Sequence, residues 1–105
     1  MATGFTPLQS GNTMIWTYAA LAAQNGLHFE AWRFPDKTIQ ASGTGTVTVE
    51  GSADGTNWEV LNDTTGAAIS LTASSNDAAV ILENPRFMRA VNAGGSSLVV
   101  ITGAR

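Results

Sequence analysis

Residues 46–61 contain two short runs of alternating apolar and polar residues, joined by the turn sequence Ser-Ala-Asp-Gly. Val47 and Val49 share one face of the first run, and Trp58 and Val60 share one face of the second. A period of two is typical of half-buried strands, and Asp-Gly between two such runs favours a tight hairpin. The segment therefore predicts a β-hairpin, and we interpret Trp58, which is in phase with Val60, as core or interface filler.

Similar runs recur along the rest of the chain, with turn sequences roughly every ten residues. Residues 14–23 also fit a helix, but their early Trp, Tyr, Ile and Thr favour a strand. The continuous apolar run at 98–101 indicates a strand buried on both faces. Further strands are predicted at 27–33, 37–41, 67–73, 79–82 and 87–91. About eight short strands predict an all-β chain, a small β-sandwich or jelly-roll-like barrel.

The chain of 105 residues is long enough for one domain. Residues 1–13 combine Gly, Thr, Pro, Ser and Asn with one aromatic residue, Phe5, and this composition predicts an extended N-terminal arm. We expect such an arm to be disordered in isolation. The predicted division is therefore an arm over 1–13 and a β-sandwich domain over 14–105.

The charge content limits the classes of partner. A net charge of -3 argues against nucleic-acid binding, which requires a basic face. No apolar run is long enough to span a membrane, and the first residues lack the pattern of a secretory signal. Only 12% of the residues are charged, about half the usual share. Such a surface is typical either of a neutral soluble domain or of a subunit covered by its neighbours.

No set of residues in the sequence indicates catalysis. Cysteine is absent, and His28 is the single histidine, without a serine in a nucleophile elbow. Asp54, Asp63 and Asp77 lie in predicted turns, where aspartate usually makes local hydrogen bonds instead of binding calcium. We therefore expect no enzyme activity, no catalytic residue, no cofactor and no metal site.

Aromatic and arginine residues are the candidates for contact with a partner. Trp16 and Trp32 are the tryptophans that we expect at an interface, since tryptophan contributes a large apolar area. Arg86 and Arg89 flank Phe87-Met88, and a spacing of three along a strand places them on opposite faces. An exposed tryptophan is also a stacking platform for sugars, so a glycan-binding module is an alternative.

Several motifs resemble those of small structural proteins of tailed bacteriophages. They comprise residues 39–43, the hairpin sequence at 47–58, the Asn-Pro-Arg-Phe-Met-Arg sequence at 84–89, and a closing Val/Ile strand that ends in Gly-Ala-Arg. The resemblance covers about residues 37–105. It implies a non-enzymatic virion protein, favouring a capsid decoration (cement) subunit that forms homotrimers on the major capsid protein or other virion proteins. The arm would then become ordered on the capsid. The partner-binding residues would be Phe5, Trp16, Trp32, Phe34, Arg86 and Arg89.

Two other interpretations remain open at this point. The same resemblance is compatible with a tail, neck or connector component of the virion. The hairpin is also similar to one found in galactose-binding-like domains, in which a Ser-x-Asp-Gly-x-x-Trp turn recurs. That family is usually longer than this chain.

Overall fold

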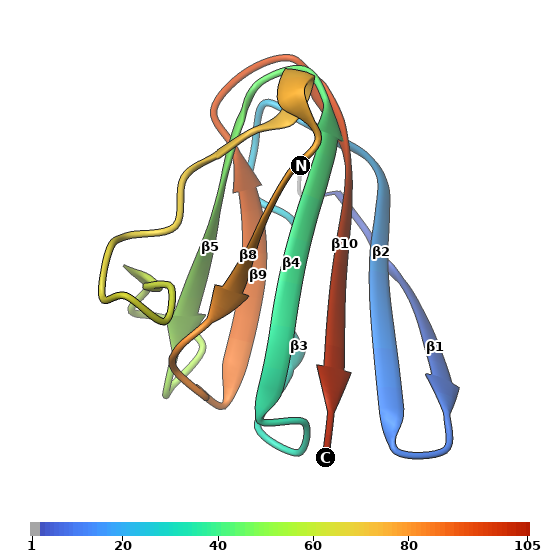
Figure 1. The fold of residues 1–105 in the computed structure, drawn as a ribbon, viewed down its shortest axis with the longest axis vertical. Helices are drawn as coiled ribbons and strands as arrows, with labels where there is room; N and C mark the ends of the chain where they lie inside the picture. The colour runs from blue at the N-terminus through green and yellow to red at the C-terminus, as the bar shows by residue number, and fades with distance from the viewer. Residues whose placement is uncertain (1–2) are drawn as a thin grey trace.

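A computed structural model describes residues 3–105 as two antiparallel β-sheets packed face to face (Figure 1). The described part of the chain has one turn of 3-10 helix, at Ala73–Ser75, and contains no helix of the length and apolarity that a membrane crossing requires. The strands are β1 (Thr6–Ser10), β2 (Thr13–Ala22), β3 (Phe29–Glu30), β4 (Asp36–Gly43), β5 (Thr46–Ser52), β6 (Glu59–Val60), β7 (Leu71–Thr72), β8 (Asp77–Ile81), β9 (Phe87–Asn92) and β10 (Ser96–Ala104).

The strand order is that of a jelly roll. The first sheet has the order β1-β2-β10-β4-β8, and Figure 1 shows these strands side by side. The second sheet has the order β3-β9-β5-β6, with β7 also paired to β5. The chain crosses from one sheet to the other at most connections, which is the connectivity of a double-sheet jelly roll. The predicted all-β sandwich is confirmed.

The predicted hairpin forms, but with a different inward phase in its second strand. Glu50 of β5 lies opposite Val60 of β6, and Val49 is fully buried. Val60 is exposed, whereas Leu61 is buried and donates its backbone N–H to the carbonyl of Val49. Trp58 is half-buried and not part of the core, so it is not core filler, and its role as interface filler stays a prediction. Because β6 is only two residues long, it does not extend the alternation back to Trp58.

Strand β2 confirms the strand interpretation of residues 14–23 and supplies the largest core side chains. Trp16 and Tyr18 both point between the sheets. The Trp16 ring stacks on Phe29 with 4.3 Å between centroids. The hydroxyl of Tyr18 donates to the carbonyl of Leu27 at 2.6 Å, which satisfies the polar end of a buried ring. Burial raises the pKa of Tyr18 well above its usual range.

The N-terminal segment is extended but belongs to the folded domain. Residues 6–10, predicted as part of an arm, form the edge strand β1 and pair antiparallel with β2. Pro7 is tolerated there because an edge strand needs hydrogen bonds on one side only. Phe5 packs edge-on against Tyr18 and Phe29, at centroid distances of 5.8 and 5.3 Å. Residues 1 and 2 of the predicted arm lie outside the described residues.

Several strands differ from the sequence predictions in length or burial. The predicted strand at 67–73 is reduced to β7, Leu71–Thr72. The predicted strand at 27–33 is reduced to β3, because Leu27 is exposed and the chain turns away after Glu30. In β10, Val99 and Ile101 are buried but Leu98 is exposed, so the prediction of burial on both faces is wrong. The physical reason is that no other element of the described chain covers the outer side of β10.

Glycine is required where the β3–β4 loop approaches β10. A Cβ at Gly103 would lie 2.6 Å from Cβ of Phe34, which is closer than such atoms come in proteins. The absence of a side chain lets Phe34 pack against Trp16 at 5.8 Å between ring centroids. The close approach fixes one end of the loop.

A buried lysine fixes the same loop. Lys37 is inward-facing on β4 and only 1% exposed. Its Nζ donates to the carbonyl of Phe34 at 2.8 Å, to the carbonyl of Ala31 at 3.4 Å, and to Oδ1 of Asn84. Burial lowers the pKa of Lys37 to about 8, although the neighbouring Asp36 carboxylate acts in the opposite direction. Three neutral acceptors thus hold this ammonium group in the interior.

Replacing Phe5 with alanine tests whether the N-terminal segment belongs to the domain. We expect Phe5→Ala to lower the free energy of unfolding by about 2 kcal/mol, because a half-buried ring is lost from the core. Leu8→Ala, in the same segment but exposed, should change it by less than about 0.5 kcal/mol. Urea unfolding of both variants measures this, and equal small effects would show a free arm.

The lowered pKa of Lys37 predicts that the free energy of unfolding increases with pH in the alkaline range. Between about pH 8 and pH 10 the folded state has released the Lys37 proton while the unfolded chain still holds it. The unfolded state then binds more protons, so stability rises with pH. We expect a gain of about 1.5 kcal/mol between pH 8 and pH 9.5. Above about pH 10 the raised pKa of Tyr18 reverses this trend, since tyrosine in the unfolded chain then ionises first.

Urea unfolding at several pH values measures the slope, and Lys37→Met is the control. Methionine keeps much of the volume but has no titrating group, so the gain should disappear in that variant. An equal gain in Lys37→Met would assign the pH dependence to another group.

Candidate interaction surfaces

The outer face of the first sheet includes two neighbouring rows of cross-strand partners, beside a further row that contains Asp36. Each of the two rows crosses all five strands, and none of its residues is buried or charged. One row is Leu8, Ile15, Thr102, Thr38 and Val80, and the other is Thr6, Thr17, Val100, Gln40 and Ala78. We call these ten residues the uncharged face. Its chemistry is that of methyl groups and hydroxyls, which contact a partner without the cost of desolvating charges.

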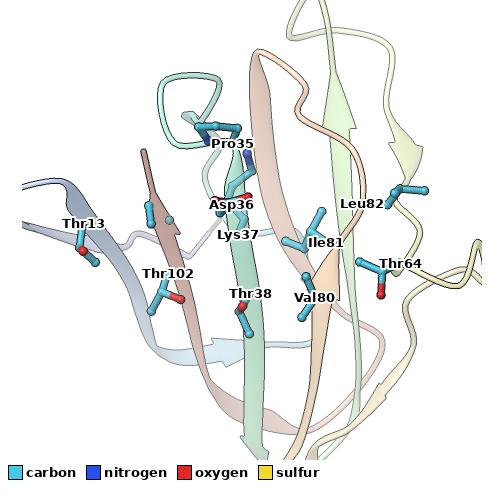
Figure 2. A pocket seen from close by; sticks show the side chains of 12 residues that line it. Thr13, Pro35, Asp36, Lys37, Thr38, Thr64, Val80, Ile81, Leu82 and Thr102 are labelled. Atoms are coloured by element: carbon cyan, nitrogen blue, oxygen red, sulfur yellow. The ribbon is translucent and has the colours of Figure 1, made fainter.

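A groove of about 520 Å³ extends the uncharged face toward one end of the sheet. Figure 2 shows Thr13, Thr102, Thr38 and Val80 following one another across β2, β10, β4 and β8. Thr64 and Leu82 close the groove on the far side of β8. Asp36 and Lys37 also line this end, but Lys37 is buried and already bonded. The groove therefore offers hydroxyls, aliphatic groups and the exposed carboxylate of Asp36, but no accessible acid–base pair.

The size of the uncharged face limits what it can bind alone. Five strands about 4.8 Å apart and about 20 Å long give the outer side of the whole sheet a flat area of roughly 480 Å², which is an upper limit for the uncharged face. A standard protein–protein interface buries about 800 Å² on each partner. One copy of this face is therefore smaller than a standard interface.

The outer face of the second sheet is charged and aromatic. Glu50 and Arg89 are direct cross-strand partners, and Nε and Nη2 of Arg89 both lie 2.8 Å from Oε1 of Glu50. The guanidinium group also lies over the Trp58 ring, at 4.2 Å from its centroid. Both charged side chains are only 20% exposed. This pair and the indole ring stabilise one another and leave little charge free.

His28 belongs to the same aromatic group. Its ring lies 5.5 Å from Trp58 and 5.4 Å from Phe87, measured between centroids. Arg86 covers the Phe87 ring at 5.0 Å. The second sheet thus has a mixed cluster of rings and guanidinium groups, whereas the uncharged face of the first sheet has neither.

The six residues predicted to bind a partner lie in three different environments. Trp16 is 2% exposed and Phe34 is also buried, so both are core residues that a partner cannot reach. Phe5 packs on the core, as described above. Sequence reasoning treated these rings as anchors because a period of two does not reveal which face of a strand is covered.

The other three residues lie on the second sheet or in the loop beside it. Arg89 is held by Glu50 and Trp58, whereas Trp32 is 47% exposed. Arg86 precedes β9, contacts Phe87 and lies 3.7 Å from Glu30. Because Arg86 precedes the regular strand, the alternation that predicts opposite faces for the two arginines does not extend to it.

The turn aspartates make local hydrogen bonds, as predicted. Oδ1 of Asp54 accepts the backbone N–H groups of Thr56 and Asn57 at 2.8 and 2.9 Å. These bonds lower the pKa of Asp54, and equivalent bonds from Thr65 lower that of Asp63. Among residues 3–105, no three His, Cys, Asp or Glu side chains are grouped so that they could hold a metal ion.

Comparisons with known proteins identify solved structures of similar fold but no family. No family model and no curated protein matches the chain. Among solved structures, protein NMB1881 from Neisseria meningitidis is similar with a TM-score of 0.57 and 8% identity, covering 100% of this chain and 87% of that one. A cupin-2 domain containing protein from Shewanella frigidimarina has a TM-score of 0.50 and 13% identity, with 95% and 80% covered. At these identities the similarity establishes the jelly-roll-like fold alone.

Proposed function

We propose that the chain is a non-enzymatic structural protein of a tailed-phage virion, a capsid decoration subunit that binds the head shell through its uncharged face. The observation that carries the proposal is the absence of charge from all ten positions of that face. Soluble surfaces usually have charged residues at a quarter to a third of their positions. Charge depletion is typical of the centre of an interface.

The distribution of charge between the two sheets supports the same proposal. The second sheet has Glu30, Glu50, Arg86 and Arg89 on or beside its outer face. On the first sheet the charged residues Asp36, Lys37 and Asp77 lie outside the ten positions of the uncharged face. A uniformly neutral domain would have two similar faces. A subunit bound to a shell has one face buried against the shell and one face exposed to solvent.

The motif resemblance supports assignment to a phage virion, and the fold is compatible with it. Jelly rolls occur in viral capsid proteins, lectins and cupins alike, so the fold alone does not select a function. The filled interior supports a non-enzymatic role. Trp16, Tyr18, Phe29 and Phe34 occupy the space between the sheets, where a small substrate would otherwise bind.

The small area of the face supports binding as an oligomer. An uncharged face of at most roughly 480 Å² is too little for a stable monomeric attachment. Three linked copies that bind one shell would convert later contacts into intramolecular ones and raise the overall affinity by orders of magnitude. A homotrimer is the state that we propose.

Placing a charge on the uncharged face tests the binding surface. Val80→Lys introduces an ammonium group at a position that is 50% exposed, so the fold should tolerate it. We expect binding to shells assembled from the major capsid protein of the same genome to fall by about a hundredfold, because a buried unpaired charge costs several kcal/mol. Co-sedimentation of purified chain with those shells measures the occupancy.

The matched control is Val60→Lys. Val60 has the same side chain and is 43% exposed, but it lies on β6 of the second sheet. Its occupancy on shells should equal that of the unmodified chain. If both variants bind as well as the original, the uncharged face is not the attachment surface, and if the unmodified chain does not bind, the decoration proposal fails.

Light scattering of the purified chain tests the oligomer. We expect a mass close to three times the 10.9 kDa of the chain. A six- or twelvefold ring would instead support the tail, neck or connector interpretation, because those parts of a virion have ring symmetry. A stable monomer at all concentrations would contradict the trimer.

A further inference from the structure

A second surface with binding chemistry lies beside the edge strand β3 of the second sheet. Glu30, Trp32, Arg33 and Arg86 line a depression of about 500 Å³. Glu30 ends β3, Trp32 and Arg33 follow it in the β3–β4 loop, and Arg86 comes from the segment that leads into β9. The four side chains are therefore brought together from two segments that are more than fifty residues apart.

Trp32 is exposed on a loop that is held rigidly. Its backbone carbonyl accepts a hydrogen bond from Nδ2 of Asn84 at 3.0 Å. The preceding Ala31 donates its N–H to the carbonyl of Arg86 at 2.8 Å, and the buried Nζ of Lys37 donates to the carbonyls of Ala31 and Phe34. An indole ring that is 47% exposed would gain free energy from burial. Presenting it on a fixed backbone reduces the entropic cost of binding a ligand.

The groups around the indole ring combine hydrogen-bond donors and acceptors. Glu30 supplies carboxylate oxygens, and Arg86 and Arg33 supply guanidinium N–H groups. The Glu30–Arg86 contact is 3.7 Å long and both side chains are more than half exposed, so it is a weak ion pair that a ligand can replace. The Arg33 guanidinium lies over the Trp32 ring, 5.2 Å from its centre, so it covers part of one face of the indole and borders a ligand that stacks on the rest of the ring.

We propose that Trp32, Glu30, Arg33 and Arg86 form a saccharide-binding site. A pyranose has an apolar face of C–H groups that stacks on an indole ring, and a rim of hydroxyls that need both donors and acceptors. The depression offers both kinds of contact in one place. A nucleic-acid strand also stacks on aromatic rings, but a chain with net charge -3 lacks the basic footprint that a phosphate backbone requires.

The site lies on the second sheet, apart from the uncharged face on the first. A subunit attached through the uncharged face would therefore leave the saccharide site accessible. The inference goes beyond the proposed decoration role and does not depend on it.

A glycan array tests the proposal with the purified full chain. The array presents neutral hexoses, N-acetylhexosamines, and uronic and sialic acids, and the strongest-bound glycan is then titrated by isothermal calorimetry. We expect Trp32→Ala to weaken the affinity about tenfold or more, as expected when an anchoring aromatic is removed. Glu30→Gln should also weaken it, because the amide offers one acceptor oxygen where the carboxylate offers two.

Leu27→Ala is the matched control. Leu27 is 49% exposed, close to the exposed fraction of Trp32, but does not line the depression. Both alanine variants should keep the melting temperature of the unmodified chain, so a selective loss in Trp32→Ala identifies the site. The proposal is overturned if no glycan binds at concentrations up to about 1 mM, or if Trp32→Ala binds as tightly as Leu27→Ala. Since no shell is present, either result leaves the test of the uncharged face unaffected.

Discussion

The buried ammonium group of Lys37 is the constraint on which the connection between the two sheets depends. A charge in a protein interior is costly unless every proton finds an acceptor. Here the acceptors come from two different segments, the carbonyls of Ala31 and Phe34 in one and the side chain of Asn84 in the other. Because all three must be in place together, the β3–β4 loop and the segment before β9 have one mutual arrangement. The exposed Trp32 lies between Ala31 and Phe34, so these hydrogen bonds also restrict the movement of its backbone.

Much of the fold could be predicted from the sequence, where strands are long enough for their period to be read. The alternation in β5 placed Val47 and Val49 on one face, and both residues are buried in the core. It failed at Trp58, since the phase of a two-residue strand depends on its partner and not on its own sequence. It failed also for residues 6–10, because a Pro-containing edge strand has the same composition as an unpaired arm.

The candidate surfaces could be predicted much less well, because they depend on register between distant strands. The Glu50–Arg89 pair joins residues 39 apart, and nothing local to either indicates that they are opposite each other. The uncharged face likewise becomes visible only when five strands are placed side by side in register. Lys37 was available to sequence reasoning, since it is in phase with the inward-facing Ile39 on β4, yet a lysine in that phase is usually an exposed residue.

The two proposed surfaces have the same physical limitation and the same remedy. The uncharged face is smaller than a standard interface, and a shallow saccharide site with one stacking ring gives weak affinity for a single sugar. Repetition compensates for both. Linked copies lose their translational freedom once, at the first contact, and each later contact is intramolecular. A shell that holds many copies by one face presents many saccharide sites on the other. The ten residues of the uncharged face and the four residues of the saccharide site do not overlap, and this allows one small jelly roll to make both contacts.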